Sequence, residues 1–354
     1  MLTSTFSWIT SKTISFPGLG IEINPPRGFQ IGGMSVYFYG IIIAFGLLLA
    51  VMYGLKRSKQ FGLKEDDILD GVLGIVPLSI IFARAYYCIF SWADFKDNPI
   101  EVLYIWNGGI AIYGAVIGAA LGVILFSLIK KVKLAAVLDL VAISFLIGQF
   151  IGRWGNFFNR EAFGAETDIF IRMGMGGVTY HHPTFLYESL WNVVGFVLLH
   201  FLSKRRQYDG QMALGYAAWY GLGRTFIEGY RMDSLYWGDF RVSQLLAALT
   251  CIIATTILVI NMFRYHDPEK LYVNTVKQAF VKEDLKKKIE KAKSDKFLKK
   301  LMGKKPTEEE ENALEALKKE LEELDNAQTS PAEETEETEE ATEEETKECE
   351  ETEE

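Results

Sequence analysis

The amino-acid sequence predicts an all-α polytopic membrane protein with about seven transmembrane helices, an extracytoplasmic arm and a disordered, charged C-terminal tail. Hydrophobic residues make up 49% of the 354 residues. They gather in runs near the roughly 20 residues that a helix needs to cross a ~30 Å hydrocarbon core. The runs lack the alternation of barrel strands. Charge is separated along the chain, since residues 306–354 carry a net charge of −20 and residues 1–305 a net charge of +11.

Four regions are expected in order. Residues 1–35, with three prolines and several glycines, should form an irregular or amphipathic segment at the membrane interface. Residues 36–265 should form the seven-helix transmembrane domain, with an outer arm at about 158–182. A charged helical segment is expected at 266–327, and residues 328–354 are too rich in Glu and Thr to bury apolar surface. The expected spans are 36–55, 68–91, 110–129, 134–154, 184–202, 212–230 and 242–263.

Basic residues gather in alternate loops, those after the first, third, fifth and seventh spans, and are sparse in the others. Loops rich in Lys and Arg stay in the cytoplasm. The N-terminus is therefore predicted to be extracytoplasmic and the C-terminus cytoplasmic. The end of the fourth span, the end of the sixth span and the 158–182 arm then face outward.

The glycines of the third span and the three cysteines are not interpreted as parts of a ligand site. The third span carries a stripe of glycines at 114, 118 and 122, which predicts close helix packing. The three cysteines are scattered and show no metal-ligand spacing, so neither a metal nor a cofactor is expected.

The end of the fourth span is unusually polar. Arg153, Asn156, Asn159 and Glu161 fall within nine residues, soon after the apolar run 140–147. Charged groups at the edge of a bilayer are costly and indicate a functional site. Arg153 and Asn156 are spaced i, i+3 and so share a helix face. Glycines at 148, 152 and 155 allow a ligand or a neighbouring helix to come close.

Further polar and aromatic residues fall at the outer ends of the other spans. The sixth span ends with Arg224, Glu228 and Arg231, whose spacing of i, i+4, i+7 permits an ion-pair ladder on one face. The others are Tyr39 in the first span, Arg84 in the second, Trp106, Asn107 and Tyr113 around the start of the third, and His182 and Glu188 around the start of the fifth.

Arg153 and Arg224 both belong near the outer leaflet. Two arginines braced by carboxylates suit a phosphate on a lipid head group, because a guanidinium binds phosphate oxygens through two parallel hydrogen bonds. From the residues alone, the alternative is an Arg–Glu network that only ties helices together.

The end of the fourth span resembles the signature of bacterial prolipoprotein diacylglyceryl transferases, Gly-Arg-x-Gly-Asn-Phe-x-Asn-x-Glu-x-x-Gly. Here the chain reads Gly152-Arg153-Trp154-Gly155-Asn156-Phe157-Phe158-Asn159-Arg160-Glu161-Ala162-Phe163-Gly164. Other features agree with the resemblance: Tyr39-Gly40, Asn107-Gly108-Gly109, His182-Pro183, Tyr187-Glu188, and Arg224 with Glu228 and Arg231. The similarity covers about residues 30–265, and the family also has seven spans with an outside N-terminus.

The resemblance implies a reaction in the bacterial plasma membrane. A diacylglyceryl group passes from phosphatidylglycerol to the lipobox cysteine of a preprolipoprotein, the first step of lipoprotein maturation, and glycerol 1-phosphate is released. The charge of the leaving phosphate must be held, and the thiol must lose its proton because thiolate is the nucleophile. The implied partners are phosphatidylglycerol, the lipobox of the signal peptide and membrane lipids, with no nucleic acid.

The resemblance also implies catalytic roles. Arg153 is expected to bind the phosphate head, and Asn156 to orient it or the glycerol. Arg224 is expected to be the second phosphate contact or a partner in deprotonating the thiol. Glu161 and Glu228 are expected to fix the two arginines.

The rest of the expected site follows from the same resemblance. Tyr39 should line the same cavity, and Gly164 suits a tight turn where the arm leaves the helix. The substrate-binding set is completed by Asn159, Arg231 and His182.

One position departs from the family pattern. Many members have His where this chain has Tyr113, and that His has been offered as the base. Tyr has a reference pKa of about 10 and is neutral at pH 7. Either the base lies elsewhere, with His182 the nearest alternative, or Tyr113 only positions the donor.

Two rival classes fit less well. A lipid or solute transporter using the same Arg/Glu network would predict internal symmetry and helices broken near the midplane, whereas the polar groups here cluster toward one side. A membrane-embedded hydrolase would need a Ser or Asp nucleophile with an orienting base, and the sequence offers no convincing pair of this kind.

The segment after the last span has two interpretations. Residues 277–305 hold 12 lysines and 4 acidic residues. This basic part lies on anionic lipid heads, or it is a solvated helix or a hairpin with the acidic part that follows.

Overall fold

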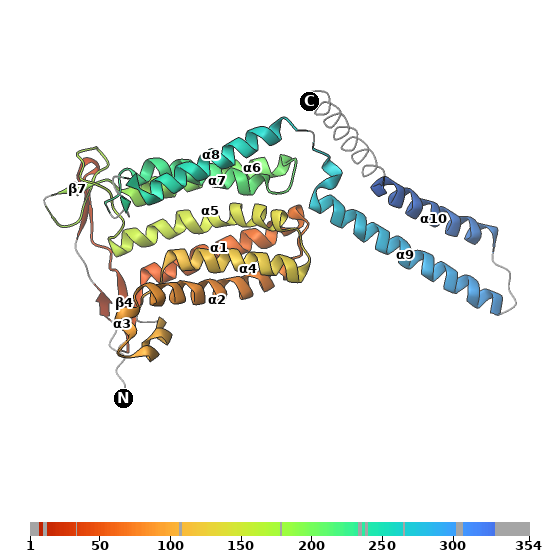
Figure 1. Cartoon of the computed structure of the whole chain (residues 1–354), viewed down its shortest axis with the longest axis horizontal. Coiled ribbons are helices and arrows are strands. Elements are labelled where there is room, and N and C mark those ends of the chain that lie inside the picture. The colour runs from red at the N-terminus through yellow and green to blue at the C-terminus, as the bar shows by residue number, and fades with distance from the viewer. Residues whose placement is uncertain are drawn as a thin grey trace, which may run out of the picture. The chain divides into compact units, whose positions relative to one another are not determined.

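A computed structural model describes residues 7–9, 13–32, 34–105, 108–177, 179–232, 236–237, 240–264, 266–301 and 307–329. The chain divides into two compact units, residues 1–273 and 274–354. In the first unit long helices lie side by side as a bundle, and short strands gather at one end of it (Figure 1). The bundle helices are α1 (Phe38–Arg57), α2 (Glu65–Phe90), α4 (Ile112–Lys130), α5 (Leu134–Asn159), α6 (Thr184–Leu202), α7 (Gln211–Glu228) and α8 (Val242–Met262).

The protein is a multi-pass membrane protein, as predicted. Within the part of the chain that the structure describes, six helices are long and apolar enough to cross a membrane. The seventh predicted span, α7, is a helix of 18 residues that is not among the six. It packs against α5, α6 and α8, so it belongs to the same bundle.

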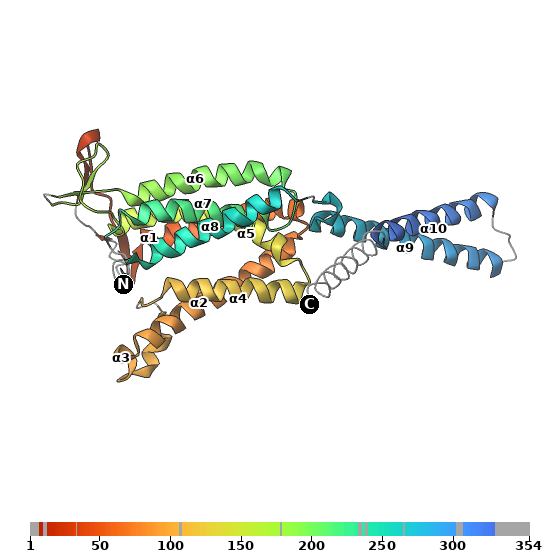
Figure 2. The same cartoon turned by 45° about the horizontal axis from the view of Figure 1, so that its top comes forward.

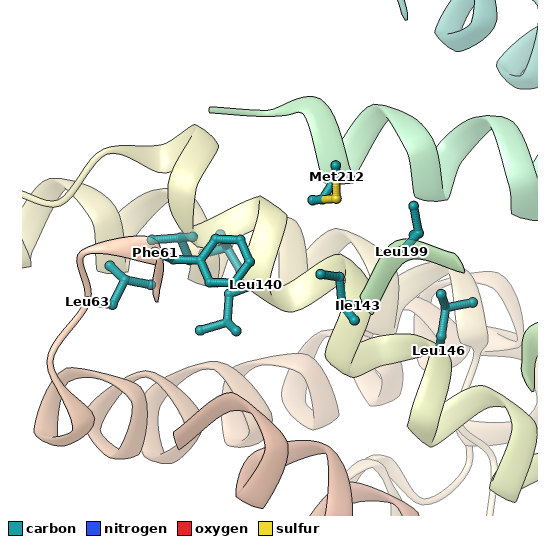
Figure 3. Close-up of a cluster of buried hydrophobic side chains, with 9 residues drawn as sticks. Phe61, Leu63, Leu140, Ile143, Leu146, Leu199 and Met212 are labelled. Atoms are coloured by element: carbon teal, nitrogen blue, oxygen red, sulfur yellow. The ribbon is translucent and has the colours of Figure 1, made fainter. Parts of the chain in front are cut away.

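Helix α5 is the centre of the bundle. It contacts α1, α4, α6 and α7, and its inward positions are fully buried, as is usual for a helix covered on several sides. Its apolar residues pack against the turn after α1 and against α6 and α7. Figure 3 shows Leu140, Ile143 and Leu146 of α5 beside Phe61, Leu63, Leu199 and Met212.

Helix α5 also holds the start of α7. The residue that precedes α7 is Gly210, which adopts a left-handed φ of 99° and has no side chain to cap the helix. The buried carboxylate of Asp139 takes that role. Its Oδ2 accepts a hydrogen bond from the Gly210 amide at 2.9 Å, and its Oδ1 accepts from Met212 and Ala213 at 2.8 and 2.9 Å. An acidic residue inside an apolar span is thus explained, because it satisfies amides that the helix leaves unpaired.

Helices α2 and α4 form a close pair, side by side in both views (Figures 1 and 2). The three glycines of the predicted stripe are buried and face α2. A methyl group added at Gly118 would lie 2.7 Å from Phe82 Cβ, and one at Gly122 would lie 3.2 Å from Ile75 Cγ1. The helix-packing interpretation of this stripe is confirmed.

The N-terminal segment folds as strands, so the expectation of an irregular or amphipathic segment is wrong for its described residues. Two antiparallel sheets have the orders β1-β4-β5 and β3-β2-β6-β7, and β8 pairs with β9 in an antiparallel manner. Strands of two to four residues offer too few positions to show alternation in a sequence. Their bounds are β1 Ser7–Ile9, β2 Ile14–Phe16, β3 Ile21–Ile23, β4 Gly28–Ile31, β5 Met34–Tyr37, β6 Met173–Gly174, β7 Tyr180–His181, β8 Tyr236–Trp237 and β9 Phe240–Arg241.

Short helices complete the connections. One is α3, Trp92–Phe95, which follows α2. The others are single turns at Pro17–Leu19, Ser58–Phe61, Pro99–Leu103, Ser203–Arg205 and Pro268–Lys270. β2 in the N-terminal segment pairs with β6 in the outer arm, so the arm and the N-terminal segment share one sheet.

The second unit contains most of α9 (Tyr272–Leu301) and all of α10 (Glu308–Thr329). Leu285 and Ile289 of α9 are buried, as is Leu314 of α10. Lys282 Nζ lies 2.8 Å from Asp325 Oδ1, which joins the basic helix to the acidic helix. The hairpin alternative is therefore observed. Residues 330–354 of the predicted disordered tail lie outside the described residues.

Gly118→Ala should destabilise the bundle, whereas Gly74→Ala should not. Overpacking costs about 1–3 kcal/mol, and the added methyl at 118 meets α2. Gly74 lies in α2 with nothing within 4 Å of an added methyl, so alanine there gains helix propensity. Thermal unfolding in detergent measures the difference, and a Gly118→Ala protein as stable as Gly74→Ala would contradict the packing.

Candidate active site

The last two turns of α5 carry the signature residues. The helix continues to Asn159, five residues beyond the predicted end of the span. Arg153 Nη1 donates a hydrogen bond to Asn156 Oδ1 at 3.4 Å, so the predicted i, i+3 contact is present. Asn156 and Asn159 both donate to Glu161 Oε1, at 3.0 and 3.3 Å. Glu161 therefore holds the two asparagines, and it is linked to Arg153 through Asn156 rather than by a direct ion pair.

The carboxylate that pairs with Arg153 is Glu188 on α6. Arg153 Nη2 forms a direct ion pair with Glu188 Oε2. Arg224 Nη1 lies 3.3 Å and Arg231 Nη1 lies 3.4 Å from Glu188 Oε1. The side chain of Glu188 is only 4% exposed. One buried carboxylate thus binds three guanidinium groups that come from α5, from α7 and from the turn after α7.

Glu188 is part of the Tyr187-Glu188 pair of the resemblance, but it was not among the predicted site residues. The signal was present, since a carboxylate in the apolar run 184–202 is costly without a partner. The identity of its partners could not be inferred, because they lie on other helices.

The predicted ladder at the end of α7 is also present. Arg224 Nη2 lies 2.6 Å from Glu228 Oε2, and Arg231 Nε lies 3.8 Å from the same oxygen. Helix α7 ends at Glu228, so Arg231 reaches back from the following turn. Arg241, at the start of α8, donates a hydrogen bond to the Glu228 backbone carbonyl. The ladder therefore ties the end of α7 to α6 and to the start of α8.

Arg153 and Arg224, which come from different helices, meet at Glu188. Their side chains are 21% and 18% exposed, so neither side chain is fully enclosed in the bundle. A guanidinium has five N–H donors in a planar fork. The pair can therefore donate to an oxyanion while Glu188 holds both groups in place.

Two tryptophans fix the position of α6 along the axis of α7. Trp191 Nε1 donates to the Trp219 carbonyl at 2.9 Å, and Trp219 Nε1 donates to the Trp191 carbonyl at 3.0 Å. Their rings stack with centroids 4.3 Å apart. Each indole lies over a glycine of the facing helix, where any added methyl would overlap it. This reciprocal contact sets the register that brings Glu188 to Arg224.

Two glycines of α5 allow the neighbouring helix α1 to approach closely. A methyl group added at Gly155 would lie 2.8 Å from the Tyr39 ring, and one at Gly152 would lie 3.1 Å from Ile43 Cδ1. Gly148 has nothing within 4 Å. The close approach of Tyr39 brings its phenol within electrostatic reach of the charged groups at the end of α5.

Gly164 is needed for close approach rather than for a turn. Its φ is not in the left-handed region, which corrects the expectation of a tight turn. It forms an isolated β-bridge with Arg231, and its amide donates to the His182 carbonyl at 2.9 Å. An added methyl would lie 2.7 Å from His182 Cβ and 2.8 Å from the Tyr230 carbonyl. Gly164 thus places the outer arm against the turn that carries Arg231.

The His182 ring lies beside this contact. Its Nδ1 is 3.1 Å from the Tyr187 hydroxyl, and its ring packs against Tyr230 with centroids 4.7 Å apart. Burial lowers the pKa of His182 below its ordinary value of 6.5, so the imidazole is neutral at pH 7.

Arg84 and Tyr113 belong to the α2/α4 pair. The Arg84 guanidinium is buried and donates to four backbone carbonyls, those of Glu101, Val102, Gly108 and Gly109. It therefore shapes the loop before α4. Tyr113 is 47% exposed, with its ring 6.2 Å from that of Tyr86. Among the contacts described for this part of the chain, none joins Tyr113 to the arginines. Trp106 and Asn107 lie outside the described residues.

A family model described as prolipoprotein diacylglyceryl transferase matches residues 26–260. The chain belongs to this family. The match of the prolipoprotein diacylglyceryl transferase family contains Arg153, Glu188, Arg224 and Arg231, and it ends before α9.

Members of the family from several bacteria are similar to the chain. The phosphatidylglycerol--prolipoprotein diacylglyceryl transferase of Listeria monocytogenes serovar 1/2a is 45% identical over 262 residues, which are 71% of this chain and 95% of the relative. That of Enterococcus faecalis is 43% identical over 265 residues, 71% of this chain and 94% of the relative. That of Limosilactobacillus reuteri is 41% identical over 258 residues, 69% of this chain and 93% of the relative.

Glu188→Gln should lower stability much more than Glu161→Gln. Removing the charge of Glu188 leaves three guanidinium groups without their shared carboxylate, at a cost of about 3 kcal/mol, the lower end for a broken buried pair. Glu161 is exposed and accepts hydrogen bonds from two neutral amides, so its loss should cost about 1 kcal/mol. Thermal unfolding of both variants in detergent tests this, and equal midpoints would show that Glu188 does not hold the site together.

Proposed function

We propose that this chain transfers the sn-1,2-diacylglyceryl group of phosphatidylglycerol to the lipobox cysteine thiol of a prolipoprotein and releases glycerol 1-phosphate. Membership of the family supports the reaction, as do relatives 41–45% identical over 93–95% of their own length. Among the residues of the site, one observation carries the proposal. Arg153 and Arg224, from different helices, share Glu188 and are both partly exposed.

The reaction needs an anion to be held and a proton to be removed. The cysteine thiolate attacks the sn-3 carbon of the diacylglyceryl group and forms the carbon–sulfur bond. The bond from that carbon to the phosphate oxygen breaks, and glycerol 1-phosphate leaves with the electron pair. The thiol proton passes to a base. Donors fixed in advance around a developing negative charge are usually the largest contribution to such catalysis.

In this proposal Arg153 and Arg224 hold the phosphate. Two separate guanidinium groups give planar donors on different sides of one phosphate. The shared carboxylate keeps them at a fixed separation, so little reorganisation is needed when lipid binds. Glu228 also holds Arg224, since its Oε2 lies 2.6 Å from Arg224 Nη2.

The neighbouring residues have supporting roles in the proposal. Asn156 orients Arg153 or the glycerol, and Glu161 holds Asn156 and Asn159 by accepting a hydrogen bond from each. Arg231 contributes a third guanidinium to the same carboxylate. The remaining residues lie around the outer side of the proposed site: Tyr39, Gly164 and His182.

The base has two candidates. The resemblance puts Tyr113 where many family members have His, but a phenol is a poorer proton acceptor than an imidazole. His182 is neutral at pH 7, because burial lowers its pKa, and a neutral imidazole can accept a proton. We propose that Tyr113 positions the donor lipid and that His182 is the better candidate for the proton acceptor.

The proposed orientation puts this site outside the cytoplasm. The arginine cluster lies at the ends of α5 and α7, and the basic loops 56–64, 130–133 and 204–206 lie at the opposite ends of the helices. Since Lys- and Arg-rich loops stay inside, the N-terminus is extracytoplasmic and the C-terminus cytoplasmic in this proposal. The relatives are named as transferases, so the transporter alternative has no support from the comparisons.

Arg153→Ala and Arg224→Lys should each reduce transfer by at least about 100-fold, as loss of one preorganised donor does in other enzymes. The assay uses purified protein, labelled phosphatidylglycerol and a lipobox peptide, and follows both the thioether product and released glycerol phosphate. Lysine keeps the charge at 224 but loses the planar fork, so this variant tests geometry rather than charge.

Arg205→Lys is the matched control, because Arg205 is exposed at the other end of the bundle. It should transfer at the parent rate. Insertion and the unfolding midpoint of each variant are measured beside activity. Transfer that survives in both Arg153→Ala and Arg224→Lys would exclude the two-arginine phosphate site.

Tyr113→Phe should retain the transfer rate within about twofold, since the proposal gives its hydroxyl group no part in proton transfer. General acid–base catalysis contributes about 100- to 10,000-fold. A loss of that size in Tyr113→Phe, with unchanged insertion, would show that the hydroxyl group takes part in proton transfer. The rate at saturating lipid distinguishes this from weaker donor binding.

A further inference from the structure

Helix α9 carries a face on which lysines and apolar side chains lie together. With 3.6 residues per turn, positions 277, 280, 281, 287, 288 and 291 fall within about one third of the circumference. They hold Lys277, Phe280, Val281, Lys287, Lys288 and Lys291. Phe280 is 73% exposed and Val281 is 43% exposed, so neither packs into a core.

The acidic helix α10 packs on a different face. Leu285 and Ile289 of α9 are buried with Leu314 of α10, and Lys282 pairs with Asp325. These α9 positions point away from the Lys277–Lys291 face by about a third of a turn. Glu320 of α10 lies within electrostatic reach of Lys288 at the edge of the face, whereas Phe280 and Val281 stay exposed.

The acids beside this face hold its lysines only weakly. Asp284 lies on the face and pairs with Lys288 at 2.8 Å, and Glu283 at its edge pairs with Lys287 at 2.7 Å. All four side chains are more than half exposed. Exposed pairs within one helix are weak and easily exchanged, so a lipid phosphate can replace the acidic partner.

The face is tethered next to a membrane span. Helix α8 ends at Met262, and α9 begins at Tyr272. The Tyr272 amide donates to Asp209 Oδ2 at 2.8 Å, and its side chain packs against the apolar core of the bundle. Lys277 follows five residues later. A short link of this kind keeps the face at a high effective concentration near the bilayer.

We propose that the Lys277–Lys291 face of α9 binds the surface of a bilayer that contains anionic phospholipids. Phe280 and Val281 enter the interface, and the four lysines contact lipid phosphates. The site is separate from the transferase site, since α9 lies outside the family match at 26–260. The proposal therefore stands or falls independently of the transfer reaction.

The test places a nitroxide spin label at Val281→Cys in the full-length protein, with its three native cysteines replaced by alanine. The protein is reconstituted in nanodiscs of phosphatidylcholine alone or of phosphatidylcholine with phosphatidylglycerol. Collisions with oxygen, which partitions into lipid, are compared with collisions with a water-soluble nickel chelate. A label at Glu290→Cys, exposed on the other side of α9, is the control site.

The label at 281 should gain oxygen collisions and lose nickel collisions only with phosphatidylglycerol present, and high salt should reverse the change. The label at 290 should not respond. Phe280→Ala and the triple change Lys287→Gln, Lys288→Gln, Lys291→Gln should each weaken the response, the latter by about fivefold in bound-to-free ratio per lysine.

The charge-matched control is Lys293→Gln, Lys318→Gln, Lys319→Gln, which removes three exposed lysines away from this face. It should leave the response unchanged. Equal collision ratios in both lipid compositions would refute the proposal. So would a label at 281 shielded from both reagents in every disc, since that result would mean that protein covers the face.

Discussion

The arrangement of the outer end of the bundle depends on one buried carboxylate. Glu188 accepts from guanidinium groups on α5, on α7 and in the turn after α7. A buried ion pair is not by itself a source of stability, because removing charges from water is costly. Its effect here is geometric, since three flexible side chains share a single anchor. Partly exposed arginines that are held in this way are prepared for an anionic ligand before it arrives.

Helix α5 makes that geometry possible by holding its neighbours at both ends. Asp139, near its start, caps α7, and Arg153, near its end, meets Glu188 on α6. Between these points the indoles of Trp191 and Trp219 prevent α6 from sliding along α7. Lipid gives little hydrophobic drive for helices to associate, so close glycine contacts and buried polar contacts must supply it. The residues that appear most out of place in apolar spans are therefore the ones that position the helices.

Much of this fold could be predicted because a membrane span is a long, uniform signal. The helix bounds fell within a few residues of the apolar runs, and the contact of Arg153 with Asn156 followed from helical periodicity. The partner of Arg153 could not be predicted, since Glu161 was nearer in sequence while Glu188 is nearer in space. The need for a glycine at position 164 could not be predicted either, because it arises from tertiary contacts with Tyr230 and His182. The short strands gave no pattern long enough to detect.

The pairing of Ser15 with Gly174 has a consequence for biosynthesis. A ribosome makes β2 about 160 residues before its partner β6, with α1, α2, α4 and α5 in between. One edge of β2 must therefore stay unpaired while several helices enter the bilayer. Unpaired strand edges attract wrong partners, and contacts this distant in sequence form late. A segment that is made early is thus among the last to reach its final structure.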